Sequence, residues 1–325
     1  MLSGSFTQPR RFLCSLFTLS ALSLGWSTPA AALEYSATQA DSQWESATPS
    51  PLMCRLSHFI PEFGEVTFSH RSGEKVKAII RPLGQVFPAG GAHLVALAPS
   101  WLPGQATADL GQVKIGRGEA GIEIANPQTE LMLEYLQRGM QPSLLQEDKD
   151  SRYSSRIARI SHLAFKPAFT EFKRCQAQLL PVNFEQIARS AVYFKSGQAD
   201  ELNQEQKDLL DLIIRYVKAD PDVGYVFLDG HTDSYGTRRD NRQLSKIRTD
   251  LVLNHLIRYG MPQELISARY HGERYPVASN SSAAGRAKNR RVTIRLEKRD
   301  PLLEQEINTD AAYGTADLAP LTTTQ

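Results

Sequence analysis

Between residues 44 and 180, the pattern of hydrophobic and polar positions predicts strands. Short apolar runs, several of which alternate with polar residues, are separated by Gly and Pro. A period of two is typical of strands in a half-buried sheet. Only residues 129–140 have helical spacing, and that run contains a glycine that can end a helix. We therefore expect a mostly β domain over residues 33–181, with strands at 53–70, 75–83, 92–99, 109–116 and 119–127.

After Pro181 the pattern changes to alternating strands and helices. Amphipathic helices are predicted at residues 199–221 and 240–260, and the second is expected to bury Leu244, Ile247 and Leu251 on one face. Strands are predicted at 191–194, 225–233, 265–273 and 290–297. The order β-α-β-α-β-β predicts one mixed sheet with helices packed on a face, over residues 182–298. The fold class is therefore α+β. Residues 299–325 have few large apolar groups and are expected to form a flexible tail.

The first 32 residues have the layout of a secretory signal peptide. Arg10 and Arg11 precede an apolar run, and small residues before Leu33 offer a cleavage site. The run from Phe12 to Trp26 is 15 residues long, shorter than the roughly 20 residues that span a bilayer. We expect cleavage and export, with no membrane-spanning segment afterwards. An uncleaved membrane anchor is the alternative.

Two cysteines, Cys54 and Cys175, remain after the expected cleavage. In an exported protein, two remaining thiols favour a disulfide. The bridge would close a long loop and contribute about 4 to 5 kcal/mol in the chain-entropy model. It would join the first predicted strand to the last segment of the β domain. Two separately buried thiols are the alternative.

Composition excludes some functions. The chain has 37 Lys and Arg against 35 Asp and Glu, a net charge of +2. This balance argues against a protein that binds nucleic acid through bulk positive charge.

The sequence contains no nucleophile elbow, zinc-protease helix or phosphate-binding loop. His231, Asp233, His271 and Glu273 could surround a metal, but H-x-D and H-x-E are weak signals. We therefore expect no enzyme, no metal and no cofactor.

The sequence GHTDSYGTRRDNRQLSKIR, residues 230–248, provides the main candidate site. Asp233 follows a predicted strand, and Arg248 lies at the margin of the apolar face of the following helix. A carboxylate accepts hydrogen bonds from an ammonium group, and a guanidinium matches a carboxylate in a bidentate geometry. The two side chains could together bind the end of an amino acid. The alternative is that Asp233 and Arg248 pair with each other and connect strand to helix.

Four motifs in this region resemble the OmpA-like peptidoglycan-binding domain family. They are GHTDSYG, NRQLSKIR, GERYP and GRAKNRRVTI, and they occur in that family's order over residues 188–297. The resemblance implies that Asp233 holds the ammonium and Arg248 the carboxylate of diaminopimelate in the cell-wall stem peptide. It implies a supporting wall of Thr232, Asn241 and Leu244, and a pocket closed or braced by Asn289, Arg290 and Arg291.

Two positions depart from the family pattern. Tyr270 stands where the family usually has a glycine, in Tyr270-His271-Gly272-Glu273. Lys195 stands where many relatives carry an acidic residue. The first departure puts the fine geometry of the pocket in doubt, but not the fold.

The upstream domain resembles the N-terminal domain of the MotY family of flagellar motor proteins. The resemblance rests on CRLSHFIPEFGEVTFSH, VALAPSWLPGQATADLGQV and the placement of the two cysteines. It implies a periplasmic, peptidoglycan-associated component of the flagellar basal body. Such a component would work with MotX to hold stator units, docking through its N-terminal domain and gripping the wall through its C-terminal domain. A general envelope-stabilising protein and a cell-wall hydrolase are the alternatives.

Overall fold

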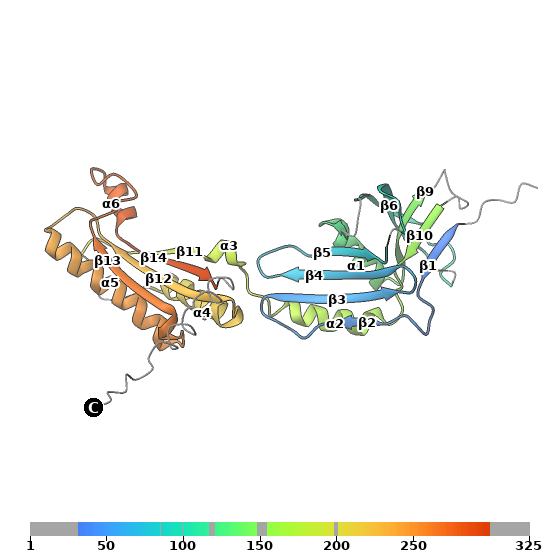
Figure 1. The fold of residues 1–325 in the computed structure, drawn as a ribbon, viewed down its shortest axis with the longest axis horizontal. Helices are drawn as coiled ribbons and strands as arrows, with labels where there is room; N and C mark the ends of the chain where they lie inside the picture. Colours follow the sequence, from blue (N-terminus) through green and yellow to red (C-terminus); the bar gives the residue numbers. More distant parts are fainter. Residues whose placement is uncertain are drawn as a thin grey trace, which may run out of the picture.

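The computed structural model describes residues 32–84, 86–99, 101–116, 121–147, 155–197 and 201–299. These residues form two lobes that lie end to end (Figure 1). Residues 1–31 of the expected signal peptide, and all of the expected tail except Arg299, lie outside the described residues. No helix among the described residues is long and apolar enough to cross a membrane.

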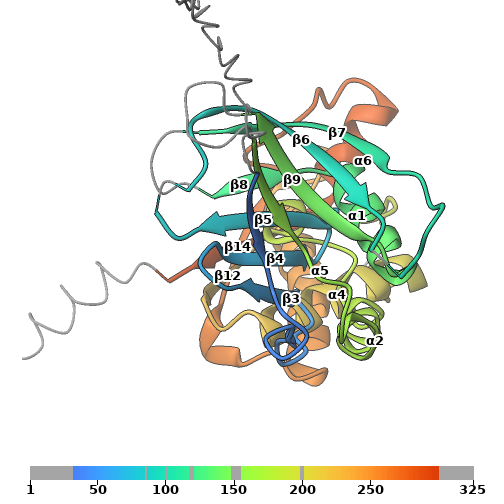
Figure 2. The ribbon, with the colours of Figure 1, turned by 90° about the vertical axis from the view of Figure 1, so that its right-hand side faces the viewer.

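The N-terminal lobe contains two five-stranded sheets. The first has the order β2(Trp44–Ser46), β3(Met53–Ile60), β4(Gly64–Arg71), β5(Lys77–Pro82), β8(Ile122–Ile124), and all its pairs are antiparallel. The second has the order β1(Leu33–Ser36), β10(Ser155–Arg159), β9(Gln141–Glu147), β6(Gly90–Leu97), β7(Ala108–Ile115), in which only β1 and β10 run parallel. Strands of the two sheets cross when the lobe is viewed from its end (Figure 2). The predicted β-rich domain is confirmed.

One hydrophobic core unites the two sheets with helices α1(Gln128–Gln137) and α2(Phe165–Gln176). Strand β3 shows the expected alternation, with Leu56 and Ile60 fully buried. The sequence pattern assigned no helix or strand to the residues of α2. The helix carries Phe165, Phe169 and Phe172 at helical spacing, and Phe165 packs edge-on against Trp44 at a centroid distance of 4.9 Å. Aromatic side chains lose rotamer freedom in helices, which weakens the helical signal of such a segment.

The expected disulfide is present between Cys54 and Cys175, whose Cα atoms are 5.8 Å apart. Both residues are 1% exposed. The bridge joins β3 to α2, so it ties the central sheet to the last helix of the N-terminal lobe. It does not start from the first strand of the lobe, because two short strands, β1 and β2, precede β3.

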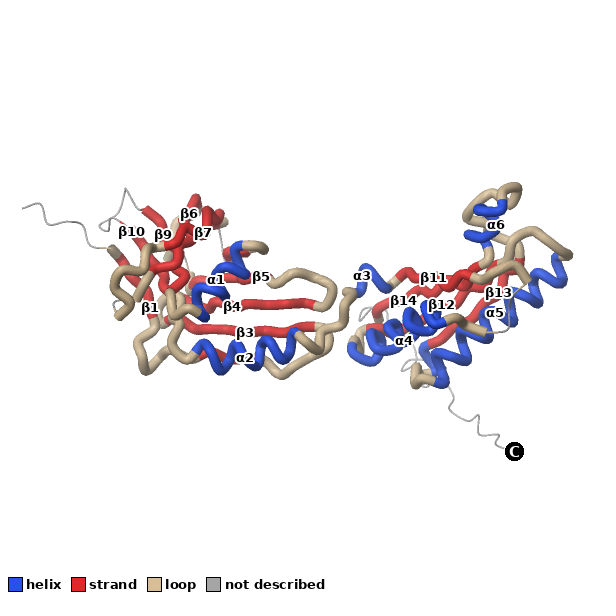
Figure 3. The backbone as a smooth tube through the Cα atoms, turned by 180° about the vertical axis from the view of Figure 1, so that it is seen from behind, coloured by secondary structure: helices blue, strands red, loops and turns tan. Residues whose placement is uncertain are grey.

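The C-terminal lobe is a four-stranded mixed sheet, as predicted. Its order is β11(Arg189–Tyr193), β14(Arg291–Lys298), β12(Val223–His231), β13(Ile266–Gly272), with β12 and β13 parallel and the other pairs antiparallel. Helices α4(Gln204–Ala219) and α5(Arg238–Arg258) lie along the sheet (Figure 3) and share its core. Three short elements, α3(Phe184–Ile187), η1(Gln263–Leu265) and α6(Ala283–Asn289), complete the lobe.

Helix α5 buries a different face from the one predicted. Ile247 is 40% exposed, and Leu244 and Leu251 are only half-buried. Its buried residues are Asn241, Ser245, Arg248, Thr249, Val252, His255 and Leu256. The prediction that Arg248 lies at the margin of the apolar face was therefore wrong, since Arg248 is fully buried. A prediction from large apolar residues does not find the buried face of a helix that packs small and polar residues against the sheet.

Reduction of the disulfide should destabilise the N-terminal lobe. We expect Cys54→Ser/Cys175→Ser, or the reduced protein, to lose about 2 to 5 kcal/mol of unfolding free energy, because the unfolded chain gains conformational freedom. Thermal unfolding followed by tryptophan fluorescence measures this, since all three tryptophans precede residue 181. An unchanged melting temperature with and without reductant would contradict it.

Candidate functional site

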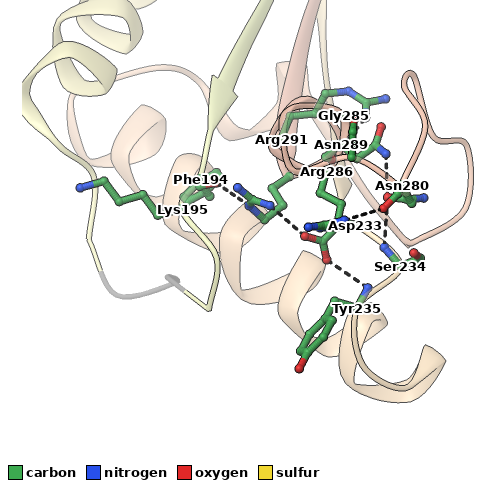
Figure 4. Close-up of polar contacts among 12 residues, drawn as sticks. Phe194, Lys195, Asp233, Ser234, Tyr235, Asn280, Gly285, Arg286, Asn289 and Arg291 are labelled. Carbon is green, nitrogen blue, oxygen red and sulfur yellow. Dashed lines mark hydrogen bonds and ion pairs between the residues drawn. The ribbon is translucent and has the colours of Figure 1, made fainter.

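Asp233 lies just beyond the end of β12, in a buried turn. Thr232 and Asp233 are 2% and 6% exposed, and the Thr232 amide donates to the carbonyl of Gly272 at 2.8 Å. This bond extends the contact between β12 and β13 past the last strand residue. Oδ1 of Asp233 accepts from the backbone N–H of Tyr235 at 3.2 Å, and Oδ2 accepts from Nη1 of Arg290 at 2.9 Å (Figure 4).

Arg248 reaches the same region from the third turn of α5. Its Nη2 donates to the carbonyl of Lys195 at 2.9 Å, and its guanidinium lies 5.1 Å from the ring centroid of Phe194. The pKa of Arg248 is lowered to about 10, chiefly by burial and also by the charge of Arg290, while the charge of Asp233 acts to raise it. Arg248 is therefore protonated at neutral pH and feels the charges of both Asp233 and Arg290.

Close packing between α5 and the sheet allows this burial. A Cβ atom on Gly230 would lie 2.1 Å from Oγ1 of Thr249 and 2.7 Å from the carbonyl oxygen of Ser245. A Cβ on Gly272, whose φ is +61°, would lie 3.1 Å from the amide nitrogen of Arg242. Glycine is required at both positions. The small residues bring the start of α5 against the ends of β12 and β13, so that Arg248 projects toward the end of β11.

Asn289 and Arg290 hold the segments around Asp233 in place. Asn289 is fully buried, and its amide group bonds the backbone of Val277 and Ala278 and the side chain of Asn280, at 2.8 to 3.1 Å. Asn289 therefore holds the loop before α6 in place. Nε of Arg290 donates to the carbonyl of Phe194 at 3.0 Å, while its Nη1 binds Asp233.

Arg291 has a structural position behind the site. It is 6% exposed, and its guanidinium donates to the carbonyl of Asn289 at 3.3 Å. Burial lowers the pKa of Arg291.

The three predicted wall residues differ in their surroundings. Asn241 is buried, and its Nδ2 donates to Oε2 of Glu273 at 2.7 Å. Leu244 is half-buried. Oγ1 of Thr232 is buried and has no hydrogen-bond partner within the part of the chain that the structure describes. An unsatisfied buried hydroxyl is unfavourable, so Thr232 is well suited to receive a ligand group.

The pairing of charges differs from the alternative in which Asp233 and Arg248 pair with each other. Within the described residues, the ion pair of Asp233 is with Arg290, and none joins Asp233 to Arg248. Asp233, Arg248 and Arg290 together carry one negative and two positive charges. The cluster has an excess positive charge that suits a carboxylate and keeps one acidic group for an ammonium ion. The Arg290 contact was missed because spacing along a sequence does not say which of several arginines reaches an acid.

The residues considered for a metal are engaged in other contacts. The rings of His231 and His271 stack at a centroid distance of 5.0 Å, and Nε2 of His271 bonds Oδ1 of Asp229 at 2.8 Å. Among the described residues, no group of three or more potential ligands could hold a metal ion.

Comparison with known proteins places both lobes. The family model of the MotY N-terminal domain matches residues 35–181, and that of the OmpA family matches residues 193–290. The sodium-type flagellar protein MotY of Vibrio parahaemolyticus is 30% identical over 267 residues, covering 81% of this chain and 89% of that protein. The chain belongs to the MotY family.

Other relatives match a smaller part of the chain. The outer-membrane lipoprotein YfiB of Pseudomonas aeruginosa is 41% identical over 95 residues, covering 29% of this MotY-family chain and 56% of that protein. The crystal structure of the peptidoglycan-associated lipoprotein from Burkholderia pseudomallei is 27% identical, covers 33% of this chain and 89% of that one, and has a TM-score of 0.31. The chain is thus a MotY flagellar protein with an OmpA-like peptidoglycan-binding domain, and this family is structural and non-enzymatic.

Acid should destabilise the C-terminal lobe of this MotY-family protein through His231. Burial, together with the charge of Arg291, lowers the pKa of His231 to about 4 from 6.5. The folded lobe therefore binds fewer protons than the unfolded chain below pH 6.5, and stability falls as the pH drops from 6.5 toward 4. The expected loss is on the order of 1 to 3 kcal/mol.

Amide hydrogen exchange in β12 and β14 at pH 7 and pH 5, corrected for intrinsic rates, measures this effect in the intact protein. His231→Asn should flatten the pH dependence, and His93→Asn, a surface histidine in the other lobe, should leave it unchanged. If His231→Asn retained the full pH dependence, His231 would not be its source.

Proposed function

We propose that this protein attaches a flagellar motor assembly to peptidoglycan by binding the zwitterionic end of diaminopimelate in the stem peptide. The observation that supports this most is the convergence of Asp233 and Arg248. The two charges come from different elements, are almost fully buried, and interact electrostatically without forming an ion pair with each other within the described residues.

Each charged group of the ligand has a partner in this arrangement. The carboxylate of diaminopimelate pairs with Arg248, whose planar guanidinium can bind it in a bidentate geometry. The ammonium binds Asp233, whose Oδ1 accepts only the backbone N–H of Tyr235 within the described residues. Arg290 holds the other oxygen and fixes the orientation of the carboxylate. The Thr232 hydroxyl supplies a further polar contact.

Recognition of one stem peptide should be weak. A hydrogen bond to a charged group contributes about 1.5 to 3 kcal/mol net, and the ligand also loses conformational freedom on binding. Several copies of the protein around one structure would bind a polymeric wall far more tightly, because each bound copy raises the effective concentration for the next. Such multivalent attachment suits a component that must resist torque.

The N-terminal lobe would dock on the motor. We assign it to partners at the basal body, including MotX and the stator units that the assembly holds. The buried Cys54–Cys175 disulfide supports a periplasmic location, since disulfides persist in oxidising compartments. The signal-peptide layout of the first 32 residues supports export.

Two conservative substitutions test wall recognition. Asp233→Asn keeps the shape of the side chain but removes its charge, and Arg248→Lys keeps the charge but removes the planar fork. Each should reduce retention on purified diaminopimelate-type sacculi at least tenfold, the effect of losing about 1.4 kcal/mol. Co-sedimentation with sacculi measures the fraction bound.

Exposed charges on α4 provide matched controls for this experiment. Asp208→Asn and Arg215→Lys make the same changes at exposed positions and should bind sacculi as the original protein does. Sacculi whose stem peptides carry lysine at the diaminopimelate position lack the carboxylate that Arg248 binds, so they should retain the protein poorly. Full retention of well-folded Asp233→Asn on diaminopimelate-type sacculi would refute the proposal.

Wall binding should also be needed for motility. In cells that depend on this protein, Asp233→Asn should abolish or strongly reduce spreading in soft agar, because stator units without a wall attachment cannot resist torque. The Asp208→Asn strain is the control, and immunoblotting confirms equal protein levels. Normal spreading of the Asp233→Asn strain would separate motor function from the wall site.

A further inference from the structure

We infer that a second, basic groove beside the stem-peptide site binds other carboxylates of the same wall polymer. The groove lies where α5 begins and β13 ends, and its volume is about 610 Å³. It is lined by Arg238, Arg239, Arg242, Tyr270, His271, Glu273 and Arg274. This inference rests on the proposed function, because it extends recognition from one amino acid to the surrounding polymer.

The groove carries more positive charge than the fold neutralises. Glu273 is the only acidic residue in its lining, and its carboxylate is already shared between Asn241, at 2.7 Å, and Arg238, at 3.4 Å. No ion pair of Arg239, Arg242 or Arg274 occurs within the described residues. All three side chains are exposed. Three guanidinium groups are therefore available to an anionic ligand from solution.

The position of these arginines is unfavourable for the helix itself. Arg238, Arg239 and Arg242 occupy the first two turns of α5, next to the positive end of the helix dipole. Arg242 is also three and four residues from the other two, at spacings where like charges repel. A carboxylate bound between them would relieve both effects. Helix stability therefore does not explain why these arginines stand at the start of α5, whereas ligand binding does.

Tyr270 gives the groove a flat apolar surface. The ring is half-buried, and Nζ of Lys246 lies 5.6 Å from its centroid. An aromatic face among guanidinium groups suits a carboxylate-bearing sugar or peptide, which presents apolar and anionic parts together.

The groove and the stem-peptide site lie on the two sides of the start of α5. Arg248 reaches toward the end of β11, whereas Arg242 adjoins Gly272 in β13, and these two strands are opposite edges of the sheet. Asn241, in the first turn of α5, is held by Glu273. A polymer that inserts one stem peptide at Asp233 would carry its neighbouring carboxylates past α5. This continuity favours the wall polymer over an anionic lipid surface.

A double variant, Arg239→Gln/Arg242→Gln, tests the inference in the intact protein. Its binding to diaminopimelate-type sacculi at low salt should weaken about tenfold, as expected for two exposed charge contacts, and the difference should shrink at high salt. Its binding to free diaminopimelate, which occupies only the stem-peptide site, should not change. Its melting temperature should rise, since the first turns of α5 lose unfavourable charge.

Arg215→Gln/Arg258→Gln is the matched control, because it removes the same net charge from exposed positions at other parts of α4 and α5. If the Arg239→Gln/Arg242→Gln protein bound sacculi as tightly as this control, the groove would not contact the wall. A loss of binding to phosphatidylglycerol vesicles with unchanged binding to sacculi would likewise overturn the inference in favour of a lipid. Asp233→Asn separates the two proposals. Unchanged binding of that variant to free diaminopimelate would refute the proposed stem-peptide site, whatever the double variant shows.

Discussion

The burial of the Arg248 guanidinium is the constraint on which the C-terminal lobe depends. A buried charge is strongly unfavourable unless hydrogen bonds and opposite charge compensate for it. Here the carbonyl of Lys195, the ring of Phe194 and the charge of Asp233 supply that compensation. The same requirement explains the two glycines under α5, because only a closely packed helix can carry Arg248 to this depth. The site is thus built into the packing of the lobe.

The packing that buries Arg248 also produces a site with three charges. Arg290 binds both Asp233 and the carbonyl of Phe194, so it fixes the acid and the end of β11 at once. In the proposed function, a ligand with one positive and one negative group would enter without displacing either arginine. In the proposed function, mechanical strength would come from copy number and from the N-terminal lobe, whose disulfide joins its sheet to its last helix.

The sequence predicted the elements whose apolar residues repeat regularly, and it predicted the motif residues through their resemblance to a family. Helix α4 and strands β3, β12 and β14 are examples. The buried face of α5 was wrong because small polar residues, and not leucines, face the sheet. The partner of Asp233 was missed because Arg248 and Arg290 are equivalent in charge and only the folded backbone selects between them. Strands β9 and β10 were not predicted, since pairing partners far apart in the chain decide such strands.

A structure of the protein bound to a soluble diaminopimelate-containing muropeptide tests the central claim most directly. The account predicts the ligand ammonium within hydrogen-bond distance of the Asp233 carboxylate and the ligand carboxylate on the Arg248 guanidinium, with Arg290 still bound to Asp233. A muropeptide bound elsewhere on the lobe, with the Asp233 and Arg248 side chains free of it, would contradict the account.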